Sequence, residues 1–80
     1  MNLANKILAV AEKHSTKASM QSSADINIVD CKYWISLGNE NLAIYRGLKS
    51  LKYSLGIFSD TYKRLCEQAR VSGFSEYVPN

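Results

Sequence analysis

The side chains best suited to catalysis or metal binding are scarce in this sequence. It contains one histidine, His14, and two cysteines, Cys31 and Cys66, which lie far apart and in no CxxC pair. A structural zinc site needs four nitrogen or sulfur ligands at close spacing, so these three residues do not form one. The sequence has no glycine-rich phosphate-binding loop, and its carboxylates are scattered rather than paired. It therefore predicts a protein that is not an enzyme and that holds no metal and no cofactor.

The two cysteines are expected to be reduced and buried. A secreted domain of this size usually carries several disulfides, whereas a free cysteine behaves as a small buried hydrophobic residue. The opening apolar run, Ile7 to Ala11, is too short for a signal peptide or for a membrane span. We therefore expect a soluble, cytoplasmic protein with no membrane insertion.

The length of 80 residues predicts a single domain over 1–80, and the apolar spacing described below predicts that this domain is helical. A domain this small buries only about 60% of the surface of its unfolded chain, so its core alone gives limited stability. Self-association, or binding to a partner, adds buried surface. We therefore expect a homo-oligomer or a protein complex.

The spacing of apolar residues predicts where the first helix lies. Leu3, Ile7 and Val10 recur every three or four positions, which places them on one face of a helix over about 2–14. Residues 15–23 are rich in serine and show no apolar period. This segment is expected to be a connector.

The next stretch, 24–55, has the clearest apolar rhythm, and it predicts either one long helix or a hairpin of two helices. A break would fall at Gly38, because glycine followed by polar residues is a common helix end. A β-hairpin is the alternative, since Val29 to Leu37 alternate strictly between apolar and other residues. The helical pattern continues beyond Gly38 and no second alternating strand follows, so helices are favoured.

A last helix is expected over about 60–71, with Ser59 or Asp60 as its N-cap and Gly73 at its end. The C-terminal tail, 74–80, is expected to fold back onto the body or to dock on a partner. Together these segments predict an all-α fold, a small bundle of three to four helices with a central helical hairpin or long helix.

Two adjacent aromatic residues, Tyr33 and Trp34, must point in different directions on a helix. Trp34 is expected to anchor the core. Tyr33 is expected at or near the surface, where a partner can reach it.

The positive charge is concentrated in one half of the chain and marks the candidate site. The formal net charge of the chain is +3, while residues 41–70 alone sum to +4. Three basic residues spaced by three fall along one flank of a helix, with tyrosines interleaved. The candidate partner-binding residues are Tyr45, Arg46, Lys49, Lys52 and Tyr53.

Such a face has three interpretations: a solvated helix surface, a docking surface for an acidic protein, or a site for nucleic-acid or nucleotide phosphate. Tyr and Arg are enriched at the energetic centres of protein interfaces. A net charge of +3 is low for a nucleic-acid binder, and no helix shows a polar base-reading face. The sequence thus favours a non-enzymatic regulator that binds a protein target stoichiometrically, with nucleic-acid binding as the alternative.

The chain resembles the small accessory proteins of large bacteriophages in its opening, MNLANKILAVAEKHS, and in the block YWISLGNENLAIYRGLKSLKYSLGIF. The resemblance is strongest to the cytoplasmic antiholins that act in lysis inhibition by T-even phages. It implies an inhibitor that binds the cytoplasmic segment of a holin and delays lysis, and it assigns no binding residues. Inhibitors of host defence complexes are likewise small and without recognisable motifs, so an inhibitor of this kind is a second alternative.

Overall fold

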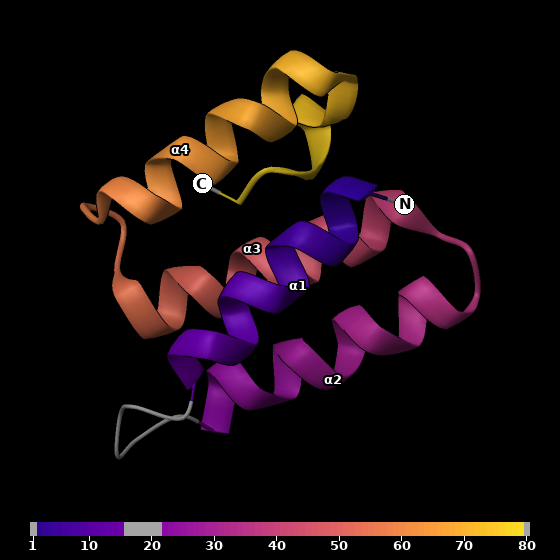
Figure 1. Cartoon of the computed structure of the whole chain (residues 1–80), viewed down its shortest axis with the longest axis horizontal. Coiled ribbons are helices and arrows are strands. Elements are labelled where there is room, and N and C mark those ends of the chain that lie inside the picture. Colours follow the sequence, from indigo (N-terminus) through magenta and orange to yellow (C-terminus); the bar gives the residue numbers. More distant parts are fainter. Residues whose placement is uncertain (1, 16–21, 80) are drawn as a thin grey trace.

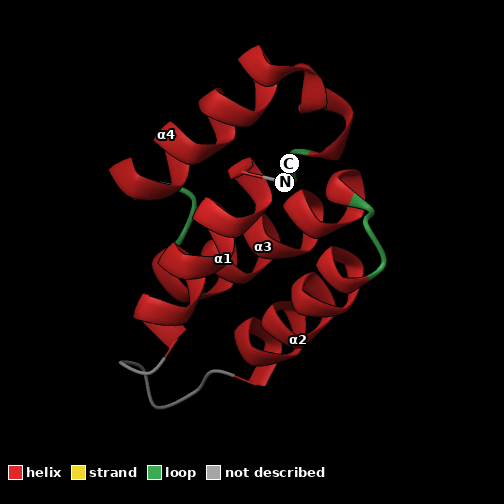
Figure 2. Ribbon diagram, turned by 45° about the vertical axis from the view of Figure 1, so that its right-hand side comes forward, coloured by secondary structure: helices red, strands yellow, loops and turns green. Residues whose placement is uncertain are grey.

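The computed structural model describes residues 2–15 and 22–79, and in this part of the chain the protein consists of helices joined by short turns (Figure 1; Figure 2). Two short turns, the π-helical η1 (Arg70–Phe74) and the 3-10 turn η2 (Ser75–Tyr77), follow the last α-helix. The α-helices are α1 (Asn2–Ser15), α2 (Ser22–Ser36), α3 (Glu40–Leu55) and α4 (Asp60–Ala69). The predicted all-α small bundle is confirmed.

The central stretch, 24–55, forms two helices rather than one. Gly38 separates them with a φ of 75°, a conformation that glycine adopts without steric cost. Asn39 then caps α3, because its side-chain oxygen accepts a hydrogen bond from the Leu42 N–H at 3.1 Å. The β-hairpin alternative does not form, since the segment from Val29 onward lies in α2 and the turn that follows it.

The predicted connector, 15–23, is shorter than expected on both sides. Helix α1 includes Ser15 and α2 begins at Ser22. The remainder of that connector, 16–21, lies outside the described residues.

The end of the predicted helix 60–71 also differs from expectation. Its α-helical part stops at Ala69, and the chain continues in the wider η1 turn, which contains Gly73 at a φ of 93°. At the other end, Ser59 is the N-cap, because its hydroxyl accepts from the Tyr62 N–H at 3.3 Å.

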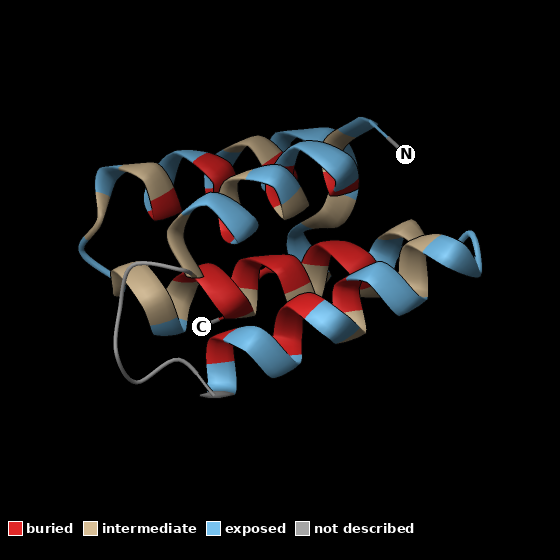
Figure 3. Cartoon of the chain, turned by 60° about the horizontal axis from the view of Figure 1, so that its bottom comes forward, coloured by how far each residue is buried: buried red, intermediate tan, exposed pale blue. Residues whose placement is uncertain are grey.

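The core lies around α3, which packs against α1 and α2 along its length and against α4 at one end (Figure 1; Figure 3). Its inward side chains are fully buried, as are three from α1. These core residues are Ala43, Ile44, Leu48 and Leu51 of α3 and Ala4, Ile7 and Ala11 of α1. Helix α3 is therefore the element whose outward face is held most firmly in place.

The C-terminal tail folds back onto the core, which is the first of the two positions expected for it. Val78 is only 8% exposed and belongs to the buried cluster, and the half-buried Phe74 packs against that cluster. Helix α4 contributes Tyr62 and Leu65 to the same cluster. The tail thus packs onto the same core cluster as α4.

The two cysteines are free and buried, which confirms that expectation. Tyr33 is 56% exposed, as predicted. Its neighbour Trp34 does not anchor the core as expected, because it is only half-buried and packs against the core from outside the buried cluster. The two rings contact each other edge to face, with centroids 5.1 Å apart. His14 lies half-buried in the last turn of α1.

Candidate functional site

The five candidate residues form one continuous face of α3. At about 100° per residue, they span roughly a third of the helix circumference, on the side away from the buried residues. Tyr53 is 53% exposed and the other four are half-buried. We call this surface the α3 face, defined by Tyr45, Arg46, Lys49, Lys52 and Tyr53.

The Tyr45 ring is the centre of the α3 face. The guanidinium carbon of Arg46 and the Nζ of Lys49 each lie 5.4 Å from its ring centroid. Both distances are within the range of cation–π attraction. The two cations and the ring therefore hold one another in place, and a partner would meet a preorganised surface rather than freely rotating side chains.

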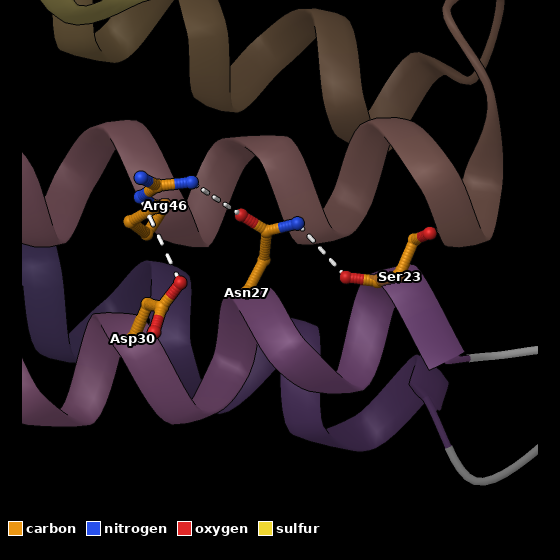
Figure 4. Close-up of polar contacts among 4 residues, drawn as sticks. All are labelled: Ser23, Asn27, Asp30 and Arg46. Atoms are coloured by element: carbon orange, nitrogen blue, oxygen red, sulfur yellow. Dashed lines mark hydrogen bonds and ion pairs between the residues drawn. The ribbon is translucent and has the colours of Figure 1, made fainter.

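Arg46 is also anchored to α2, as Figure 4 shows. Its Nε lies 3.9 Å from Asp30 Oδ2, and its Nη1 donates a hydrogen bond to Asn27 Oδ1 at 3.4 Å. Asn27 is only 6% exposed, and its amide nitrogen donates to the Ser23 carbonyl at 2.8 Å. Arg46 therefore joins α3 to α2 as well as contributing to the α3 face.

Asp30 and Asn27 were not among the sequence candidates, although the sequence contains a signal for the ion pair. In an antiparallel helical hairpin, residues equally far from the turn lie opposite each other. Asp30 and Arg46 are each eight positions from Gly38. A hairpin of two helices therefore predicts the contact between Asp30 and Arg46, whereas one long helix does not.

A second surface, on the outer side of α2, was only partly foreseen. Large apolar side chains recur there every three or four positions, and each is more than half exposed. They are Ile26 at 61%, Val29 at 65%, Tyr33 at 56% and Leu37 at 58%. Of these residues only Tyr33 was predicted to be exposed, because Val29 and Leu37 also fit the strand alternative.

Helices α1 and α4 line an open surface cavity of about 230 Å³, away from the α3 face. It is lined by Lys6, Val10, Thr61, Arg64, Leu65 and Gln68. Lys6 Nζ donates to the side-chain oxygen of Gln68 across it at 3.1 Å. The cavity is smaller than most ligand sites, and its lining has no carboxylate, cysteine or histidine for acid–base or nucleophilic chemistry.

Among residues 2–15 and 22–79, no three His, Cys, Asp or Glu side chains gather as metal ligands would. None of the described helices combines the length and apolar character needed to cross a membrane.

A comparison of the chain with known protein families, curated proteins and solved structures finds no match in any of the three. The function is therefore inferred from the α3 face and from the outer surface of α2.

Proposed function

We propose that this protein is a non-enzymatic regulator that binds a protein target stoichiometrically through the α3 face. The observation that carries the proposal is Tyr45 held between Arg46 and Lys49, with the exposed Tyr53 along the same helix. Tyr and Arg are the residue types that dominate the energetic centres of protein interfaces. A rigid, central helix presents them, so little conformational entropy is lost on binding.

The charge of the α3 face favours an acidic partner surface. Lys49 contacts an aromatic ring, and no ion pair joins it to a carboxylate within the described residues. An acidic side chain of a partner would approach Lys49 without displacing an internal ion pair. Such complementarity speeds association and fixes the orientation of the complex.

Nucleic-acid binding is less well supported by the same geometry. Phosphate binding draws its affinity from the number of cations that can neutralise phosphates. Arg46 is already turned toward Asp30 and Asn27, which leaves the face with fewer available charges than its sequence suggests. A surface with few available cations would hold an oligonucleotide weakly and only at low salt.

We extend the proposal to the class of target through the resemblance to cytoplasmic antiholins. In this proposal the protein acts in the cytoplasm, covers the cytoplasmic segment of a holin and delays lysis by preventing assembly. A component of a host defence complex is the alternative target. Both targets would be blocked by mass action, with no turnover.

Site-specific photocrosslinking tests the proposed face. Tyr53 is replaced by the photoreactive aromatic residue p-benzoylphenylalanine, and Phe58 is replaced in the same way as a matched control. Phe58 is 82% exposed and lies between α3 and α4, off the α3 face. Irradiation in cells that naturally express the protein is expected to join position 53, and not position 58, to one protein target.

Three other results would contradict the proposal. Crosslinks to nucleic acid from position 53 would favour the alternative function. Crosslinks to a protein target from position 58, with none from position 53, would place the binding surface elsewhere. Absence of any adduct from position 53 would remove the α3 face as the site.

A further inference from the structure

The outer surface of α2 is an apolar stripe that nothing in the described structure covers. We call it the α2 face, defined by Ile26, Val29, Tyr33 and Leu37, each more than half exposed. These residues lie opposite the buried Cys31 side of the helix. A row of exposed large apolar residues along one helix is unusual for a monomer and marks an interaction site.

We propose that the α2 face binds the α2 face of a second copy of this chain, with the two helices antiparallel and related by a two-fold axis beside Val29. Three residues of the stripe fit this arrangement, because they are nearly symmetric about Val29, and Leu37 extends the stripe beyond this symmetric part. Ile26 lies three positions before Val29, and Tyr33 lies four positions after it. In the antiparallel pair, Ile26 of each copy packs beside Tyr33 of the other.

The charges along one flank of the stripe favour the same pairing. Asp25 and Lys32 are seven positions apart, so they lie on the same flank of α2, on either side of Val29. Antiparallel packing brings equal flanks together and sets Asp25 of each copy opposite Lys32 of the other. Parallel packing would instead bring opposite flanks together and place Asp25 and Lys32 of each copy beside the Asp30 flank of the other, without the Asp25–Lys32 pairing.

Lys32 is able to make this contact without breaking the ion pair that it forms within its own chain. Its Nζ lies 2.8 Å from Glu12 Oε2, and its side chain remains 56% exposed. An ammonium group has three donors, so it can donate to a second carboxylate as well as to the first. The opposite flank carries Asp30, whose charge is offset by Arg46 of the same chain, so the two copies of Asp30 do not repel strongly.

The dimer would also place the two α3 faces on one side. The Asp30 flanks of both copies meet across the two-fold axis, and Arg46 adjoins each flank. Two copies of the α3 face would then form one larger surface, and a bivalent target would bind with greater avidity. This consequence rests on the proposed function, whereas the dimer itself does not.

Analytical ultracentrifugation over a concentration series is the first test. Four side chains per copy bury less than the roughly 800 Å² per partner of a typical stable interface, so we expect a dimer with a micromolar Kd. Val29→Glu is expected to give a monomer with an unchanged helical circular dichroism spectrum. Val71→Glu is the matched control, because Val71 is 74% exposed outside the stripe, and it is expected to remain dimeric.

Either of two results from this series would overturn the proposal. One is a wild-type chain that stays monomeric up to about 500 μM, well above the expected Kd. The other is a Val29→Glu chain that dimerises as strongly as the wild type.

A charge swap tests the antiparallel register and does not depend on Val29. Asp25→Lys and Lys32→Glu are each expected to weaken self-association by about fivefold or more, because each sets like charges opposite each other. An equimolar mixture of the two variants is expected to dimerise again, with both chains in the dimer by native mass spectrometry. No weakening in Asp25→Lys, or no recovery in the mixture, would overturn the register.

Crosslinking at position 53 that persists in a monomeric Val29→Glu chain would show that the proposed function stands without the dimer.

Discussion

Gly47 of α3 lies so close to Ile7 of α1 that a β-carbon at position 47 would be 2.6 Å from Ile7 Cγ2. The same β-carbon would be 3.3 Å from the Cys31 sulfur on α2. The absence of a side chain at Gly47 therefore allows the three helices to meet. This contact fixes the position of α3, and with it the surface that α3 presents outward.

Gly47→Ala is expected to lower the free energy of unfolding by about 1–2 kcal/mol. Overpacking at this contact costs about 1–3 kcal/mol, and the better helix propensity of alanine returns part of it. Thermal or urea unfolding measures the difference. In an Ile7→Ala background, where the contacting methyl group is gone, the same substitution is expected to be neutral or stabilising. An equal loss in both backgrounds would contradict the contact.

Ser50→Ala is expected to leave the protein as stable as before or more stable, by up to about 1 kcal/mol. The Ser50 side chain is fully buried, and its hydroxyl has no hydrogen-bond partner among the described residues. Removing an unsatisfied buried hydroxyl removes its desolvation cost. Ser54→Ala is the matched control, because the Ser54 hydroxyl donates to the Leu51 carbonyl at 3.5 Å on the same helix. A larger loss of stability from Ser50→Ala than from Ser54→Ala would disprove the prediction.

Stability is expected to fall as the pH rises through the alkaline range. Burial, helped by the charge of Glu12, raises the pKa of the Cys31 thiol to about 11 from 9.0. Burial also raises the pKa values of Cys66 and of the Tyr62 hydroxyl. The folded chain therefore keeps protons that the unfolded chain has released above about pH 9, and stability is lost as the pH approaches 11.

Urea unfolding between about pH 8 and pH 10.5 checks this trend. Each of these groups contributes a slope of at most about 1.4 kcal/mol per pH unit. Cys31→Ala is expected to be less stable at neutral pH, since it leaves a cavity, but to show a shallower alkaline slope than the wild type. Identical slopes for the two proteins would contradict the role of the buried thiol.

The polar contacts at Arg46 are expected to differ in their contribution to stability. Asn27→Ala removes a buried amide and leaves the Ser23 carbonyl and Arg46 without it, which costs about 1–3 kcal/mol. Asp30→Ala removes a half-exposed carboxylate 3.9 Å from Arg46 Nε, so its cost is below about 1 kcal/mol. Chemical denaturation of the two variants gives the comparison. A larger effect from Asp30→Ala would mean that the ion pair, and not the amide, holds Arg46 in place.

The helices themselves were predictable from local signals. Gly38 and Asn39 mark the α2–α3 turn, and Ser59 marks the start of α4, each through backbone conformation or a cap that the residue type favours. One undecided point was whether 24–55 breaks at Gly38. The apolar pattern runs through that glycine on both sides, so periodicity alone does not reveal the break.

The candidate site was predictable as a helix face but not as a set of contacts. Lys49 and Tyr53 share a side of α3 through helical spacing alone. The contact of Arg46 with Asp30 and Asn27 depends on how α2 packs against α3, which no single helix encodes. The α2 face was obscured for a related reason: α2 carries apolar residues on two opposite sides, and only the packed structure shows which side is buried.

The most direct test of the α3 face is the affinity of the purified protein for the target identified by crosslinking, measured by isothermal titration calorimetry. The wild type is compared with Lys49→Glu and with Lys63→Glu, an identical charge reversal at an exposed position of α4. We predict that Lys49→Glu weakens binding about tenfold or more, while Lys63→Glu changes it less than about twofold. Equal affinity for the wild type and Lys49→Glu would contradict the proposal that the α3 face binds the target.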